Sequence, residues 1–137
     1  MPTNTAPGTQ LSTDQREQGK QFAPKFDASG LLTAVVTDAA TKEVLVVAFM
    51  NQEALDLTRA TGSVHFWSRS RGTLWLKGET SGNVLRVEEI LVDCDQDALV
   101  IRAVPAGPTC HTGEASCFYR VLDPSAQDEA ALSRGSR

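Results

Sequence analysis

Three aspartates alternate with other residues in Asp93-Cys94-Asp95-Gln96-Asp97, and their types and spacing point to metal chemistry. Alternate side chains of an extended chain share a face, so the three carboxylates would lie opposite Cys94. Such crowding of like charges is costly unless water or a cation neutralises it. A straight strand separates the outer two by about 13 Å at the backbone, so one ion requires a bend or only two ligands. A solvated strand end is the alternative. An EF-hand loop is excluded, because Ala98 and Val104 stand where it needs Gly and Glu.

The three cysteines, Cys94, Cys110 and Cys117, are a second candidate for metal chemistry. Six residues separate Cys110 from Cys117, enough for a loop to return both thiolates to one metal, and Cys94 could be a third ligand. Three protein ligands and an open position are typical of catalytic zinc, whereas His111 or His65 would close a structural site. The spacing matches neither a zinc ribbon nor a zinc nucleobase deaminase. Core packing of the cysteines and a Cys110–His111 nucleophile pair remain alternatives.

Two loops carry groups that could bind phosphate. Ser68-Arg69-Ser70-Arg71 is predicted at a hairpin tip, where guanidinium groups and hydroxyls can grip an anion, although arginines at a turn are usually only solvated. The segment 77–82, Lys-Gly-Glu-Thr-Ser-Gly, combines a cation, hydroxyl donors and two glycines but is not a Walker loop. Trp67 and Trp75 are more typical of a core than of a base-stacking platform.

The elements that must position these groups are mostly strands. Apolar and β-branched runs predict hairpins from 31–37 with 44–49, 63–68 with 73–77 and 84–94 with 98–104, and a last strand over 117–122. One helix is predicted between Asn51 as N-cap and Gly62 as its end, with Met50, Ala54 and Leu57 facing the sheet. We therefore expect a mainly β (α+β) fold, a compact mixed-sheet pseudo-barrel with one covering helix.

The domain organisation follows from composition. Residues 1–22 are polar and predicted to be a flexible N-terminal tail, residues 23–122 form one domain, and 123–137 form a C-terminal tail or short helix. The 137 residues are 41% hydrophobic and 22% charged, which excludes a disordered or fibrous chain. The net charge of −4 argues against a nucleic-acid partner. The sequence has no apolar run of membrane-spanning length and no visible export signal, so we expect a cytoplasmic protein without a membrane partner.

Taken together, four segments resemble the phosphoribosyl-AMP cyclohydrolase family of histidine biosynthesis. They are residues 64–71 (VHFWSRSR), 74–82 (LWLKGETSG), 92–98 (VDCDQDA) and 107–118, which contains GPTCHTG and SCF. The likeness covers about 31–119 in the expected order and excludes both tails. It implies a monofunctional hydrolase that opens the adenine ring of 1-(5-phosphoribosyl)-AMP at the C6–N1 bond, with zinc activating the attacking water.

The resemblance also implies the site residues. Zinc, one ion per subunit, would be held by Cys94, Cys110 and Cys117, with Cys94 from one chain and the other two from its partner in an intertwined homodimer. Magnesium would be held by Asp93, Asp95 and Asp97, and His111 would be the catalytic base or proton shuttle. Substrate contacts are expected from Arg69, Ser70, Arg71, Lys77, Thr80, Ser81 and His65. A structural-zinc binding module and a zinc purine deaminase are the rival hypotheses; chelation would unfold the first, and the second would release ammonia.

Overall fold

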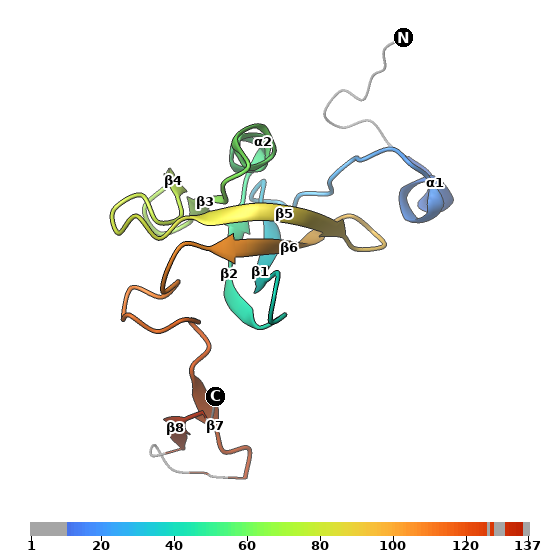
Figure 1. Ribbon diagram of the computed structural model, residues 1–137. Coiled ribbons are helices and arrows are strands. Elements are labelled where there is room, and N and C mark those ends of the chain that lie inside the picture. The colour runs from blue at the N-terminus through green and yellow to red at the C-terminus, as the bar shows by residue number, and fades with distance from the viewer. Residues whose placement is uncertain (1–10, 126, 128–130, 136–137) are drawn as a thin grey trace.

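The structure is a computed structural model that describes residues 11–125, 127 and 131–135 (Figure 1). Its main body is a curled mixed sheet with one helix against it, as the sequence predicts. The described elements in chain order are α1 (Thr13–Gln18), β1 (Leu32–Asp38), β2 (Val44–Met50), α2 (Gln52–Thr61), β3 (His65–Ser68), β4 (Thr73–Leu76), β5 (Leu85–Val92), β6 (Ala98–Pro105), β7 (Arg120–Leu122) and β8 (Leu132–Arg134).

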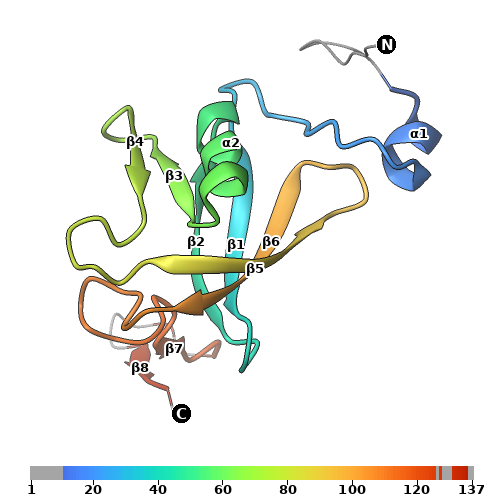
Figure 2. The ribbon, with the colours of Figure 1, turned by 45° about the horizontal axis from the view of Figure 1, so that its top comes forward.

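The main sheet has six strands in the order β4-β3-β2-β1-β6-β5. Its neighbours pair antiparallel except β1 and β6, which run parallel in the middle. The three predicted hairpins are therefore confirmed, and the parallel β1–β6 pair joins the third hairpin to the first two. The sheet curls into a half-barrel, with α2 covering one face (Figure 2).

The core lies on the face of the sheet that α2 covers. Alternate residues of the central strands point into it, and Ala34, Val36 and Ile101 are fully buried. The helix α2 begins after Asn51, whose side chain accepts a hydrogen bond from the Ala54 amide at 2.9 Å. It ends at Gly62, where a φ of 77° favours glycine.

The buried face of α2 differs slightly from the predicted one. Ala54, Leu55 and Thr58 are its buried residues, whereas Leu57 is only half-buried. Thr58 belongs to this face because its hydroxyl is satisfied inside the protein, donating to the Ala54 carbonyl at 2.8 Å and accepting from the His65 amide at 2.9 Å. A periodicity argument based on apolar residues alone does not detect such a threonine.

The described segments before β1 and after β6 lie outside this sheet. At the N-terminal end, α1 carries a capping box between Ser12 and Gln15. At the C-terminal end, the predicted last strand is present as β7, shorter than 117–122. The alternative of a short helix within 123–137 falls partly on residues 126, 128–130 and 136–137, which lie outside the described part of the chain, whereas residues 132–134 form strand β8, which pairs antiparallel with β7. No helix in the described part of the chain is long and apolar enough to span a membrane.

Candidate active site

The three aspartates converge on a turn rather than along a strand. Strand β5 ends at Val92 and β6 begins at Ala98, so the predicted extension of the strand to Cys94 is wrong. The Gln96 amide donates to the Asp93 carbonyl at 3.1 Å, and Gln96 has a left-handed φ of 62°. This bend brings one carboxylate oxygen of each aspartate within 4.8 Å of the other two. The turn therefore supplies the bend that a shared ion requires.

Hydrogen bonds among the carboxylates, together with their like charge, shift the pKa values of Asp93 and Asp97 in this acidic turn, the segment Asp93–Asp97. Hydrogen bonds with Asp93 and Asp95, together with their negative charges, raise the pKa of Asp97 to about 6. Partial burial acts to raise the pKa of Asp93, but hydrogen bonds from Asp97 and from the backbone amides of Ala98 and Asp97 outweigh it, so the pKa lies below its ordinary value. Three oxygen ligands with excess negative charge fit a hard cation such as Mg²⁺.

A tight loop after β6 holds Cys110 and Cys117. Within it the Thr109 amide donates to the Ala115 carbonyl at 3.3 Å, and the Cys110 amide donates to the Glu114 carbonyl at 3.1 Å. The far side of the loop is fixed to the end of the sheet, because the Cys117 amide donates to the Leu45 carbonyl at 2.8 Å. These backbone bonds return the second cysteine toward the first.

The two thiols of this loop affect one another's ionisation. Two hydrogen bonds from Thr112, one from its hydroxyl at 3.0 Å and one from its backbone, lower the pKa of the Cys110 thiol and so favour the thiolate. Partial burial raises the pKa of the Cys117 thiol, and the charge of the neighbouring Cys110 raises it further. A zinc ion would stabilise the thiolates of both cysteines, since zinc binds thiolate sulfur and neutralises its charge.

Cys94 lies far from the other two cysteines within one chain. It sits in the acidic turn before β6, whereas the Cys110 loop follows that strand, so the two loops lie at opposite ends of β6 (Figure 2). The eight residues of β6, at the usual rise of an extended strand, span roughly 25 Å. Among the described residues, the acidic turn is the one group of three metal-ligating side chains that gathers in the chain. A single copy therefore offers two thiolates at one end of β6 and one at the other.

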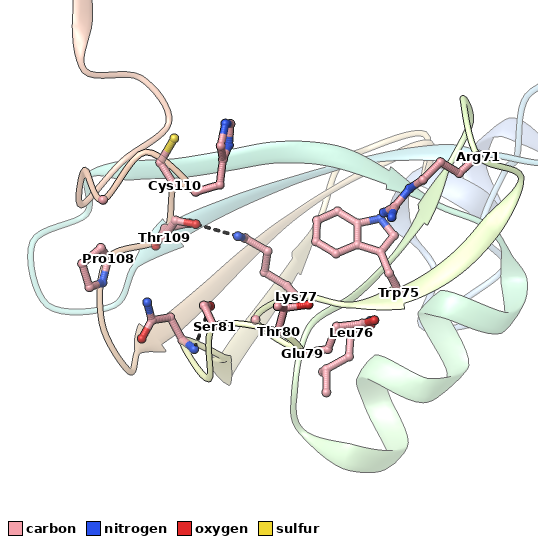
Figure 3. A pocket seen from close by; sticks show the side chains of 14 residues that line it. Arg71, Trp75, Leu76, Lys77, Glu79, Thr80, Ser81, Pro108, Thr109 and Cys110 are labelled. Carbon is pink, nitrogen blue, oxygen red and sulfur yellow. Dashed lines mark hydrogen bonds between the residues drawn. The ribbon is translucent and has the colours of Figure 1, made fainter.

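A hollow of about 440 Å³ lies beside the Cys110 loop (Figure 3). Lys77 extends across it from the end of β4, and its ammonium donates to the Thr109 carbonyl at 2.5 Å. Thr80 and Ser81 line the same hollow from the β4–β5 loop, and Cys110 and His111 line it from the opposite side. The hollow therefore places a cation and two hydroxyls beside a thiol and an imidazole.

A second hollow, of about 470 Å³, also borders Trp75. The predicted hairpin tip contributes Arg69, Ser70 and Arg71, and Arg71 and Trp75 line both hollows. The Arg69 guanidinium lies 4.1 Å from the centre of the Phe49 ring, which holds this cation against β2. Two neighbouring cationic hollows thus share one aromatic wall.

The structure brings together most of the predicted substrate residues, but His65 is not among those that line these two hollows. It is half-buried in β3, with Nδ1 2.9 Å from the Ser63 carbonyl oxygen. Trp75 packs against the core, as the sequence predicts, but the sequence did not indicate that it also borders the hollows. Its ring packs 5.3 Å from Phe66 and also walls both hollows, a dual position that its alternation in β4 does not reveal.

Comparison with known proteins identifies the family. The phosphoribosyl-AMP cyclohydrolase profile matches residues 46–119, the part of the chain that carries both hollows, the acidic turn and all three cysteines. The chain belongs to the phosphoribosyl-AMP cyclohydrolase family. It is thus an enzyme, and the resemblance noted in the sequence is confirmed.

Individual members of the phosphoribosyl-AMP cyclohydrolase family match most of the chain. The protein of that name from Erythrobacter litoralis is 63% identical over 115 residues, covering 84% of this chain and 92% of its own length. That from Sphingopyxis alaskensis is 62% identical over 110 residues, covering 80% of this chain and 87% of its own. That from Brucella abortus is 63% identical over 122 residues, covering 88% and 87%.

Proposed function

We propose that this protein hydrolyses the C6–N1 bond in the adenine ring of 1-(5-phosphoribosyl)-AMP, a step of histidine biosynthesis. The observation that carries the proposal is the first hollow, where a cation and hydroxyls face Cys110 and His111 in a chain of the phosphoribosyl-AMP cyclohydrolase family. Alkylation at N1 makes the purine cationic and C6 electrophilic. Water adds at C6, the C6–N1 bond breaks, and N1 leaves with a proton. The oxygen from water stays in the new carboxamide.

His111 is the proposed group for moving the proton. It borders the hollow and is exposed, so its imidazole can accept a proton from the attacking water and return one to N1. His111→Ala is expected to lower kcat while zinc content stays the same. Full turnover by a zinc-loaded His111→Ala protein would remove this role from His111.

The two hollows suit a substrate with two phosphates. We assign one phosphoribosyl arm to Lys77, Thr80 and Ser81, and the other to the loop carrying Arg69, Ser70 and Arg71. Lys77→Met should lower kcat/KM by about 10–100-fold, mainly through KM, because it removes a charged hydrogen bond to phosphate. Arg86→Met is the matched control, since Arg86 is an exposed cation on β5 that pairs with Glu88 and does not line either hollow. Equal losses in both variants would refute the assignment. His65 is proposed to support this site from β3.

Zinc is proposed at the cysteines. Cys110 and Cys117 fit it because their loop gathers two thiols and the hydrogen bond from Thr112 favours a thiolate. A zinc ion bound there would supply Lewis acidity to activate water. Cys94 would be the third ligand, and because it lies at the other end of β6 we propose that a second copy of the chain supplies it.

A homodimer accounts for both Cys94 and the outer face of the sheet. Directly paired residues of four strands form an apolar row there, Val47–Val35–Val100–Leu91, opposite the face that α2 covers. Val47 is 40% exposed and Leu91 38% exposed in the single chain. A second copy that covered this row would bury apolar surface and bring its Cys94 toward the Cys110 loop.

Shared sites can be tested by complementation between two inactive variants. Cys94→Ser and Cys110→Ser homodimers should each lack activity. In a mixed dimer, the Cys110→Ser chain supplies Cys94 and the Cys94→Ser chain supplies Cys110 and Cys117, which rebuilds one complete site. Co-refolding equal amounts should therefore restore about a quarter of wild-type activity and zinc. No recovery, in mixtures shown to contain mixed dimers, would contradict ligand sharing.

Magnesium is proposed at the acidic turn, where three carboxylates satisfy the oxygen preference of a hard cation. Such an ion would offset phosphate charge. We also propose that the protein acts in the cytoplasm, where its three free cysteines would stay reduced and able to bind zinc.

The proposed reaction is tested by turnover of 1-(5-phosphoribosyl)-AMP, followed by the absorbance change on ring opening. The purified protein is assayed as isolated, after zinc removal with a chelator and after zinc is restored. Activity that is lost and regained with zinc is the expected result. No turnover by a folded, zinc-loaded dimer with Mg²⁺ would refute it, and ammonia release from an unsubstituted adenine nucleotide would favour a deaminase instead.

A further inference from the structure

Gln96 is a buried residue in the middle of an exposed turn. Only 5% of Gln96 is accessible, whereas Asp93, Cys94 and Asp97 around it are exposed. Its left-handed φ of 62° is uncommon for a residue that has a Cβ. A glutamine held in this conformation, with its amide inside the protein, requires compensating contacts.

Those contacts come from residues 16–25, the segment that runs from the end of α1 toward β1, which we call the N-terminal clamp. The Gln96 side chain accepts from the Ala23 amide at 2.7 Å and donates to the carbonyls of Arg16 and Gln21 at 2.9 and 3.2 Å. The Gln96 carbonyl also accepts from the Lys25 amide at 2.7 Å. One residue of the acidic turn therefore makes four hydrogen bonds to a segment more than 70 positions away.

The N-terminal clamp is itself held against the body. Phe22 packs on the hydrophobic core, and the Arg59 guanidinium of α2 lies 5.3 Å from the centre of its ring. The Arg16 guanidinium donates to the Ala23 carbonyl at 2.5 Å, which closes the segment around Gln96. The hydrogen bonds to Gln96 thus connect the acidic turn to a fixed part of the protein.

The backbone of Gln96 also determines how the aspartates meet. Its amide donates to the Asp93 carbonyl at 3.1 Å, and the Asp93 carboxylate accepts from the amides of Asp97 and Ala98 at 2.9 and 3.1 Å. Repulsion between the three carboxylates acts to open this turn. The contacts of Gln96 oppose that opening, because a wider turn would have to pull its amide group out of the clamp.

We propose that the N-terminal clamp, acting through Gln96, is a positioning element that holds Asp93, Asp95 and Asp97 in place to bind a divalent cation. This inference rests on the proposed magnesium site. Gln96 does not contact the ion in this arrangement. It reduces the conformational entropy that the turn would lose on binding the ion, because the turn is already ordered.

The test measures Mn²⁺ binding to the full-length protein by electron paramagnetic resonance, since Mn²⁺ prefers the same oxygen ligands as Mg²⁺. Ala23→Pro removes the amide that donates to Gln96 and leaves the sequence of the acidic turn unchanged. Ala23 already precedes Pro24, which restricts it to extended conformations. We expect Mn²⁺ to bind about tenfold more weakly, the lower end of the usual effect of outer-shell partners. Ala23→Ser keeps the amide and should bind like wild type.

Equal Mn²⁺ affinity in folded Ala23→Pro and wild-type protein would overturn the proposal. Circular dichroism and thermal melting check the fold. If Ala23→Pro does not fold, Gln96→Gly replaces it, because glycine accepts the left-handed φ and removes the whole side chain while keeping the backbone carbonyl that binds the Lys25 amide. A second readout needs no variant: linkage requires that Mg²⁺ slow hydrogen exchange at the Ala23 and Lys25 amides of the wild-type protein. Unchanged exchange at both would also overturn the proposal.

Turnover assays on the same preparations separate this inference from the proposed function. Clamp-dependent Mn²⁺ binding without turnover of 1-(5-phosphoribosyl)-AMP would refute the proposed reaction and support the positioning role. Turnover by a protein whose Mn²⁺ affinity is the same with and without the Ala23 amide would support the reaction and refute the positioning role.

Discussion

Replacing Gly78 by alanine should distort the loop that forms the floor of the first hollow. Gly78 has a φ of +90°, and a Cβ there would lie 2.4 Å from the carbonyl carbon and oxygen of Asn83 and 2.6 Å from the Val84 nitrogen. All three are backbone atoms, so a change of side-chain rotamer cannot relieve the overlap. The loop itself would have to move. Gly82, in the same loop, has a φ of +81° and open space where its Cβ would be, which makes it the matched control.

The expected cost of Gly78→Ala has two parts. A left-handed conformation costs alanine about 1–2 kcal/mol, partly offset by roughly 0.4–1 kcal/mol because alanine restricts the unfolded chain. The overlap adds about 1–3 kcal/mol. Gly78→Ala should therefore lower the free energy of unfolding by about 1–5 kcal/mol, whereas Gly82→Ala, which carries only the first part, should lower it by no more than about 1.5 kcal/mol.

The assay is urea unfolding of both variants and wild type at one fixed protein concentration, since dimerisation would make stability concentration-dependent. KM measured well below the unfolding transition should also rise in Gly78→Ala, because a moved loop displaces Lys77, Thr80 and Ser81 from their positions around the hollow. If the two alanine variants differ in unfolding free energy by less than about 0.5 kcal/mol, the backbone overlap is not a real constraint and the reasoning fails.

Two further predictions concern the helix contact and the acidic turn. Thr58→Val should lower the free energy of unfolding by about 1–3 kcal/mol, because it leaves the His65 amide without its acceptor. Thr58→Ser keeps the hydroxyl and should lower the free energy of unfolding by only about 1 kcal/mol, the cost of one methyl group. Equal urea unfolding midpoints for the two variants would contradict this prediction. The raised pKa of Asp97, about 6, means that the native state binds its proton more tightly than the unfolded chain. Its stabilising contribution is therefore present below about pH 4 and is lost as the pH rises through 6. Asp95→Asn should lower this pKa in metal-free protein, and carboxyl NMR titration showing no change would refute the repulsion argument.

Local chemistry made much of the fold predictable. Asn51 and Gly62 bound α2 in the structure as they do in the sequence, because a cap and a left-handed stop act on their own few residues. The hairpins were predictable for the same reason, since each pairs neighbouring segments through a short turn. The predicted face of α2 omitted Thr58, which is buried because its hydroxyl accepts a hydrogen bond from β3, and it included Leu57, which is only half-buried.

The candidate site was predictable in its residue types but not in its geometry. The motifs pointed to the acidic turn, the Cys110 loop and the loops at Arg69 and Lys77. They did not reveal that Trp75 walls both hollows or that Gln96 is buried, because each residue's role depends on what packs against it.

The sequence by itself determined the chemical groups, their order along the chain and the family to which the protein belongs. The tertiary structure alone decided which of them meet. Asp93, Asp95 and Asp97 converge because a turn with left-handed Gln96 replaces an extended strand, and that turn is held by residues more than 70 positions earlier. Cys94 and Cys110 stand apart because β6 lies between them. Hydrogen bonds between distant segments and the rigid length of a strand leave no periodicity in sequence, so only the folded chain reveals them.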